Sequence, residues 1–271
     1  MANLVTQHEP IVIFGAGAFF IDRHVGGKPS GTERFIGDVI AGSVSATVQR
    51  QTVYSGNGAV ATKLVDKITQ IDRSLGLTPQ DATLDNMALF LMARNPQKIA
   101  EVAEKSLATS WPVPDTVTSR DYFQFGTAKN DLVGPAKITL GNSAKLIFAP
   151  ALDAEDYAFD ISTGRLRLTD SGIAKAKGKT LKLTIDKVKT EEFERVEVTA
   201  DLKPIRVALR YIEDADEGVE GRNIYIPRAT VAPSGDATLL GRNTPQQFPL
   251  TLSIEDPGDG LAQMYIDGVP T

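Results

Sequence analysis

The sequence predicts a mostly β protein, an antiparallel β-sandwich or barrel with one packed α-helix and a long projecting hairpin. Three observations support this fold class. Alternating apolar and polar residues dominate the chain after residue 117, turn signals separate the alternating segments, and helical periodicity is confined to the region before them. Strands that alternate in this way bury one face and expose the other. Several short strands without intervening helices are typical of sandwiches and barrels.

The length of 271 residues allows one large domain or two small ones. No stretch between 35 and 255 resembles a free linker. We therefore expect an N-terminal arm over 1–34, one β domain over 35–255 and a short C-terminal tail over 256–271. The arm is predicted because glycines and a proline cluster at 26–31, where they would act as hinges.

Two segments rich in β-branched residues, 35–54 and 61–75, flank the sequence SGNG. Asn57 and Gly58 form a dipeptide that favours hairpin turns, because both residues tolerate a positive φ. We expect one long antiparallel hairpin with its tip near 55–60. Strands of this length would project beyond an ordinary core.

Helical signals follow the hairpin. Thr78 can cap a helix, Pro79 suits the first helical position, and Asp81 supplies a carboxylate to the first turn. These signals predict a helix over about 79–93. The residues that would face the core recur at helical spacing, and they are Leu84, Met87, Ala88 and Leu91.

A second, weaker amphipathic stretch covers 96–109. Asn95 precedes Pro96, as at a helix start, and Pro112 and Pro114 would end the helix because proline lacks a backbone donor. We expect a helical segment here as well.

The remaining segments have the period of β-strands, with turns at Thr163-Gly164, 233–236 and 256–260. Four strands are predicted from their alternating apolar residues. These residues are Leu166 and Leu168; Leu181, Leu183 and Ile185; Ile205, Val207, Leu209 and Tyr211; and Phe248, Leu250, Leu252 and Ile254.

The composition excludes much chemistry. Without cysteine the chain cannot form disulfides, thiolate metal sites or cysteine nucleophiles. Its two histidines, His8 and His24, lie near the start without a helix to bring them together, so neither a shared metal site nor a Ser-His-Asp triad is expected. A net charge of -5 disfavours tight binding of phosphate backbones. We expect no cofactor, no metal and no enzymatic activity.

The segment IVIFGAGAFF places Gly15 and Gly17 in the first two slots of a dinucleotide-binding fingerprint. Phe20 stands in the third slot, where a small residue is needed. The glycines and proline at 26–29 would also break the helix that must follow. These glycines are better interpreted as allowing a chain segment to bend and pack closely.

Contact with other copies is expected from the arm. Exposed phenylalanines cost solubility unless they bury against something, and the edges of an all-β fold must be covered. The start of the chain lacks a basic head followed by an apolar run, and no apolar stretch is long enough to span a membrane. We expect an unprocessed chain without membrane insertion.

Five segments, taken in order, carry a family resemblance. They are LDNMALFLMA at 84–93, DYFQFG at 121–126, LDAEDYAFDISTGRLRL at 152–168, NIYIPRATVAPSGDATLLG at 223–241 and FPLTLSIEDPGDGLAQMYID at 248–267. They resemble segments of the major tail tube proteins of long-tailed bacteriophages. The first resembles the helix of that family and the second the strand that follows it. The third resembles an aspartate-tyrosine strand with its glycine turn and return strand, and the last two resemble the closing strands. The stretch 96–109 departs from this pattern.

The resemblance implies a structural virion protein of which six copies form a ring, with rings stacked into the tail tube that delivers the genome. Its partners would be further copies of itself and other tail proteins: the tape measure, terminator and distal tail proteins. DNA would only pass through the lumen, where an acidic surface repels it. The protein would be assembled in the host cytoplasm and reside in the virion.

In the family that this chain resembles, the long hairpin and the terminal arms bridge neighbouring rings. Carried onto this sequence, the resemblance implies inter-subunit contacts at Phe14, Phe19, Phe20, Tyr54, Ser55, Gly56, Asn57 and Gly58.

Other functions stay open. A related phage-derived tube or a tail-completion ring protein would share the fold and differ in what stacks on what. A β-sandwich that binds carbohydrate or a receptor is disfavoured by the absent signal peptide and the single tryptophan. Self-association separates the tube and ring proteins from the carbohydrate- or receptor-binding module. A ligand-induced shift of the melting temperature without self-association would favour a binding module or an enzyme.

Overall fold

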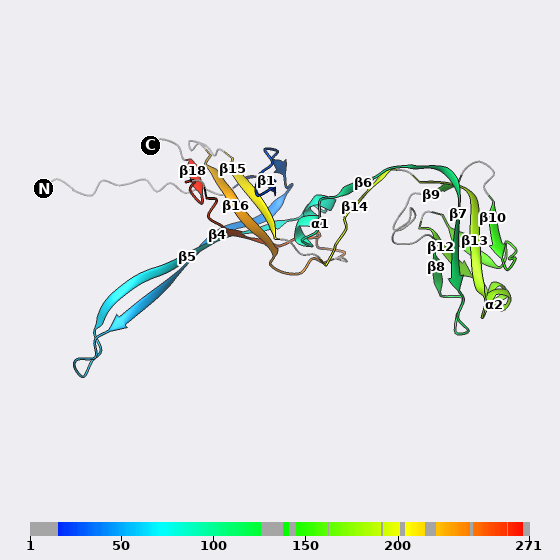
Figure 1. Ribbon diagram of the computed structural model, residues 1–271, viewed down its shortest axis with the longest axis horizontal. Helices are drawn as coiled ribbons and strands as arrows, with labels where there is room; N and C mark the ends of the chain where they lie inside the picture. The colour runs from blue at the N-terminus through cyan, green and yellow to red at the C-terminus, as the bar shows by residue number, and fades with distance from the viewer. Residues whose placement is uncertain are drawn as a thin grey trace. The chain divides into compact units, whose positions relative to one another are not determined.

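The computed structural model describes residues 16–125, 138–140, 145–161, 163–190, 192–200, 204–214, 221–238, 241–258 and 260–267 (Figure 1). The chain is mostly β, with 53% strand, two short helices and antiparallel sheets, and no closed barrel is found in the described part. It divides into two compact units. Unit 1 comprises residues 1–96 and 196–271, and unit 2 comprises residues 97–195.

Unit 1 is built on one nine-stranded sheet. The main path of the sheet runs in the order β2-β1-β15-β16-β17-β5-β4, while β3 pairs with β1 and β18 pairs with β16. The strands are β1 (Gly17–Val25), β2 (Lys28–Pro29), β3 (Arg34–Phe35), β4 (Val39–Tyr54), β5 (Lys63–Pro79), β15 (Ile205–Glu213), β16 (Asn223–Pro233), β17 (Leu250–Ile254) and β18 (Tyr265–Asp267).

The core of unit 1 lies against β15, β16 and β17, and the alternation predicted for 205–211 and 248–254 is largely confirmed. All four apolar residues predicted for 248–254 are buried, as are Val207 and Leu209, whereas Ile205 and Tyr211 are only partly covered. The apolar faces of the strands meet in a single cluster that also holds Leu75 and Leu77 from the base of β5.

Residues 17–25 form β1 rather than a hinged arm. The strand pairs antiparallel with β15, from Gly17 opposite Glu213 to Arg23 opposite Val207, and Ile21 is buried in the core. A Cβ at Gly17 would lie 2.3 Å from the carbonyl oxygen of Ile212. Glycine therefore permits a close approach of backbone here, in line with the interpretation of these glycines as packing residues.

The helix after the hairpin is α1 (Leu84–Phe90), shorter than the predicted 79–93. Its N-cap is Thr83, whose side chain accepts a hydrogen bond from the backbone N–H of Asn86. Thr78 and Pro79, which were expected to start the helix, instead belong to β5, because sheet pairing extends to Pro79.

The buried face of α1 also differs from the predicted one. It consists of Asn86, Ala88 and Leu89, whereas Leu84 and Leu91 are exposed. The Asn86 side chain donates to the carbonyl oxygens of Ile36 and Asp81, at 2.8 and 2.9 Å. These bonds satisfy a polar group that apolar periodicity alone would have assigned to solvent.

The described part of unit 2 contains three small antiparallel sheets, in the orders β10-β13-β7 with β9 beside β13, β11-β12-β8, and β14-β6. Its elements are β6 (Gln97–Ile99), β7 (Val102–Pro112), β8 (Tyr122–Gln124), β9 (Ile138–Leu140), β10 (Leu146–Ala149), β11 (Tyr157–Asp160), β12 (Arg165–Leu168), α2 (Asp170–Ala176), β13 (Thr180–Thr190) and β14 (Phe193–Arg195).

The two larger sheets of unit 2 share one core, and here the predicted alternation is confirmed. The leucines of β12 and the apolar residues of β13 are all fully buried. Helix α2, which the sequence analysis did not anticipate, covers part of this core through Ala176. Its signals were local: Thr169 caps it and Asp170 lies in its first turn.

The predicted helical stretch 96–109 is wrong. These residues form β6 and most of β7, and β7 pairs with β13 from Pro112 opposite Thr180 to Leu107 opposite Ile185. Pairing with β13 supplies backbone partners that outweigh a weak helical propensity.

The division into units differs from the single β domain expected over 35–255. The chain enters unit 2 through β6 and leaves it through β14, and these strands pair, with Phe193 opposite Ile99. Because β6 and β14 form a hydrogen-bonded pair of strands with ordinary strand composition, these segments lack the composition of a linker in the sequence.

Candidate assembly surface and neighbouring hollows

The long hairpin predicted from the sequence is present. Strands β4 and β5 pair from Val39 opposite Pro79 to Tyr54 opposite Lys63 (Figure 1). On its other side β5 pairs with β17 only over Ser74 to Leu77. From residue 73 to the tip, the hairpin is therefore a two-stranded ribbon that extends past the rest of its sheet.

The two faces of this ribbon differ in polarity, because side chains alternate along each strand. On one face Ser45, Thr47 and Gln49 lie opposite Ser74, Asp72 and Gln70. The other face, here named the apolar hairpin face, carries Val44, Ala46, Val48, Ile68 and Ile71, with Arg73 opposite Ala46 and Arg50 opposite Ile68.

The apolar hairpin face continues outward from the buried core. Val44 lies opposite Leu75, which is buried, whereas Val48 and Ile71, which lie opposite each other, keep 40% and 42% of their surface exposed. Ile68 is 49% exposed. Several exposed apolar side chains gathered on one face of a ribbon are typical of an interaction site.

Both edges of the ribbon are open. β4 is the last strand on the sheet path, and no described strand pairs with its outer edge. The edge of β5 is likewise unpaired, among described residues, from position 73 toward the tip. Long unpaired edges present rows of N–H and C=O groups to which another chain can add.

The tip is a loop over 55–62 rather than a two-residue turn. The Ser55 N–H donates to the Thr62 carbonyl at 2.7 Å and the Asn57 N–H donates to the Ser55 hydroxyl at 3.1 Å. Gly58 has a φ of +113°, a value that suits glycine. The structure thus gathers five of the predicted contact residues at this tip: Tyr54, Ser55, Gly56, Asn57 and Gly58.

The predicted contact residues of the arm lie elsewhere. Phe19 packs on Tyr211 with ring centroids 4.6 Å apart, and Phe20 packs on Phe35 at 5.6 Å. Both rings are partly buried within unit 1, so much of their apolar surface already has a partner in the same chain. Phe14 lies outside the described residues.

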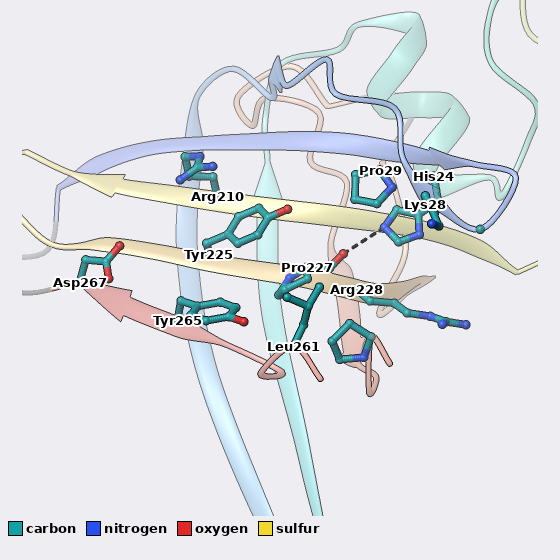
Figure 2. A pocket seen from close by; sticks show the side chains of 12 residues that line it. His24, Lys28, Pro29, Arg210, Tyr225, Pro227, Arg228, Leu261, Tyr265 and Asp267 are labelled. Carbon is teal, nitrogen blue, oxygen red and sulfur yellow. Dashed lines mark hydrogen bonds between the residues drawn. The ribbon is translucent and has the colours of Figure 1, made fainter. Parts of the chain in front are cut away.

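Unit 1 also carries a hollow of about 740 Å³ beside β16 and β18 (Figure 2). Tyr225 and Tyr265 lie opposite each other on these strands, with ring centroids 6.4 Å apart. The Arg210 guanidinium lies 4.7 Å from the Tyr225 ring centre and is held by an ion pair with Glu33. The hollow therefore has an aromatic wall with a cation fixed above it.

His24 also lines this hollow, and one of its two ring nitrogens makes a hydrogen bond. Its Nε2 lies 3.0 Å from the Pro227 carbonyl oxygen, which can only accept, so Nε2 carries the hydrogen (Figure 2). Its Nδ1 is buried without a hydrogen-bond partner among the described residues. Burial raises the pKa of the Tyr225 hydroxyl, and the positive charge of Arg210 partly offsets that rise.

A compact ionic cluster lies in unit 2. The Lys175 ammonium contacts the Asp156 carboxylate at 2.6 Å and that of Asp153 at 2.7 Å, and the Ser171 hydroxyl donates to Asp156 at 2.6 Å. Together these contacts, Lys175 first, lower the pKa of Asp156 to about 2. Asp156 also receives the Asp153 N–H, so the cluster ties the loop before β11 to helix α2.

Sequence reasoning missed the apolar hairpin face and both tyrosines of the hollow. The alternation of Val44, Ala46 and Val48 was a usable signal for the face. The tyrosine pair had none, because Tyr225 and Tyr265 become neighbours only through strand pairing.

No group of acidic or histidine side chains able to hold a metal ion occurs in the described ranges. None of the helices found there has the length and apolarity needed to cross a membrane. Comparison with protein-family models and with curated proteins finds no match for the chain.

Proposed function

We propose that this chain is a structural protein whose copies assemble into stacked rings, and that these rings form the tail tube of a long-tailed bacteriophage. The observation that carries the proposal is the long hairpin, with an apolar face and two open edges. The occupant of that face is a second copy of the same chain.

The dimensions of the hairpin are adequate for such a contact. β4 has 16 residues, which at about 3.3 Å per residue span about 50 Å. Two strands about 5 Å apart make a ribbon roughly 10 Å wide, so each face offers about 500 Å². The apolar hairpin face alone therefore offers more than half of the roughly 800 Å² that each partner contributes to a standard protein interface, and the open edges of the hairpin would add to the contact.

The contact geometry also suits rings. A hairpin that lies on a different surface of the next copy makes a head-to-tail contact, and such contacts close into rings or continue as helical stacks. Six copies per ring is the number that the sequence resemblance implies. The net charge of -5 suits a lumen through which DNA slides without binding.

The finer fold and the remaining contacts belong to the same proposal. Two sheets over one core in unit 2 support a sandwich-like arrangement there. Residues 1–34 and 256–271 would add contacts between rings, and the accessible parts of Phe19 and Phe20 would take part. Tape measure, terminator and distal tail proteins would bind the ends of the tube within the virion.

Negative-stain electron microscopy of the purified protein, dilute and then concentrated, tests the proposal, with light scattering to give the mass. Hollow tubes or rings of uniform diameter are expected. A chain that stays monomeric at every concentration would contradict self-assembly. Other tail proteins added to preformed tubes would then distinguish a tail tube from a related phage-derived tube.

The hollow in Figure 2 favours a second candidate, a small-ligand or carbohydrate-binding module, because Tyr225, Tyr265 and the fixed Arg210 offer an aromatic and cationic surface. That function predicts a rise in melting temperature with ligand and no self-association.

A further inference from the structure

A second hollow of unit 1, of about 600 Å³, is lined by arginines from three separate elements. Arg23 comes from β1, Arg94 from the turn after α1, and Arg206 from β15. We name this site, with the adjacent Asn95, the arginine hollow. Its volume lies within the range of small-ligand pockets.

Arg23 is the least exposed of these arginines, and no carboxylate of the described residues pairs with it. One guanidinium nitrogen, Nη2, donates to the Ala93 carbonyl at 3.2 Å, and Nη1 donates to the Asn95 side-chain oxygen. Within the described ranges it makes no ion pair, although the charge of Asp85 acts on it from a distance. Burial lowers the pKa of Arg23, because partial desolvation disfavours its positive charge.

Some arginines of unit 1 are neutralised by carboxylates, whereas Arg34 and Arg73 donate to neutral side chains. Arg210 pairs with Glu33 at 2.9 Å and Arg222 pairs with Glu213 at 2.7 Å. Within the arginine hollow, Arg206 pairs with Glu255 at 3.1 Å. Arg23 and the exposed Arg94 therefore bring positive charge that no neighbouring carboxylate, in the part of the chain that the structure describes, contacts.

We propose that the arginine hollow binds an oxyanion, the phosphate group of a small molecule, between Arg23 and Arg94. A guanidinium has five N–H donors in a planar fork that matches phosphate oxygens, and Arg23 uses two of its nitrogens on neutral acceptors. Because the arginines converge on a hollow instead of forming a stripe, and because the net charge is -5, a duplex backbone is the less suitable occupant. The proposal is independent of whether the chain assembles.

Isothermal titration calorimetry of the full chain with sodium phosphate, at an ionic strength held constant with sodium chloride, tests the proposal. We expect saturable binding. Arg94→Gln should weaken it about tenfold, the size of one lost charge-assisted hydrogen bond, and Arg23→Gln should weaken it at least as much. Arg242→Gln is the matched control, because Arg242 is an exposed arginine of the same unit outside the hollow.

Circular dichroism and the melting temperature confirm that each variant folds, and Arg94→Gln keeps the test valid if Arg23→Gln does not fold. A short DNA duplex titrated under the same conditions separates the two sources of phosphate. Binding that Arg94→Gln weakens and Arg242→Gln does not would support the site. Absence of saturable phosphate binding, equal losses in both variants, or binding of the duplex alone would overturn it.

Discussion

Replacing Val48 and Ile71 by threonine should impair assembly without unfolding the protein. The two residues lie directly opposite each other on the apolar hairpin face, 40% and 42% exposed. Threonine is β-branched, so it keeps the strand propensity of the ribbon while removing apolar surface. Because the site is exposed in the single chain, the change in its free energy of unfolding should stay within about 0.5 kcal/mol.

The expected loss follows from the exposed fractions. Full burial of a valine or isoleucine side chain contributes about 1.5–3 kcal/mol. Burying the remaining two fifths of each residue in an interface would therefore contribute about 1 kcal/mol, or about 2 kcal/mol for the pair. Threonine keeps a γ-methyl group, so this energy is the upper bound of the loss, and the association constant for each contact between copies should fall by up to about 30-fold.

Sedimentation velocity over a concentration series, with electron micrographs of the same samples, measures this effect. The matched control is Gln49→Thr with Gln70→Thr, a pair that lies opposite on the polar face of the same ribbon. The control should assemble like the unmodified chain. Equal critical concentrations for the Val48/Ile71 variant and the unmodified chain would refute the assignment of this face to an interface.

Three further predictions concern other parts of the chain. Replacing Asn57 and Gly58 by valine should impair tube formation more than it lowers the melting temperature, since Gly58 has a φ of +113° at a loop far from the core. Electron microscopy measures tube formation and calorimetry measures the melting temperature, and unimpaired tubes would count against a contact at the tip. Leu183→Ala, at a fully buried position of β13, should destabilise unit 2 by about 2–5 kcal/mol in denaturant titrations, and a smaller loss would show that the cavity collapses. The pKa of Asp156 is about 2 in the folded chain against an ordinary 3.8, so the stabilisation from its carboxylate is present above about pH 4 and is lost as the pH falls through 2. Asp156→Asn should therefore lower the melting temperature at neutral pH and flatten the dependence of the melting temperature on pH below pH 4. An unchanged acid profile would contradict the role of the Lys175 contact.

The predictable elements were those with a clear local period. Leu181, Leu183 and Ile185 alternate with polar residues, and all are fully buried in β13. The long hairpin could also be predicted from the sequence, because segments rich in β-branched residues lie on both sides of a glycine-rich tip. Alternation reports directly which face of a strand is buried, so it needs no knowledge of the partner strands.

The errors arose where distant partners decide the local structure. Residues 96–109 have a weak helical period but form strands, of which β6 pairs with β14 and β7 with β13. Residues 17–25 lack a clean alternation but form a strand that pairs with residues 207–213 of β15. In α1, Asn86 is buried because its amide reaches the carbonyl of Ile36, a contact between segments 50 positions apart.

By itself the sequence determined that the protein is mostly β, which strands bury leucines and valines, and where one long hairpin turns, because side-chain alternation and glycine-rich turns are properties of short segments. Only the tertiary structure decided that β1 joins the sheet, that residues 97–195 form a unit of their own, that Tyr225 lies opposite Tyr265, and that Arg23 and Arg94 line one hollow. These arrangements depend on hydrogen bonds and packing between segments far apart in the chain, and such contacts produce no periodic pattern of apolar residues in the sequence.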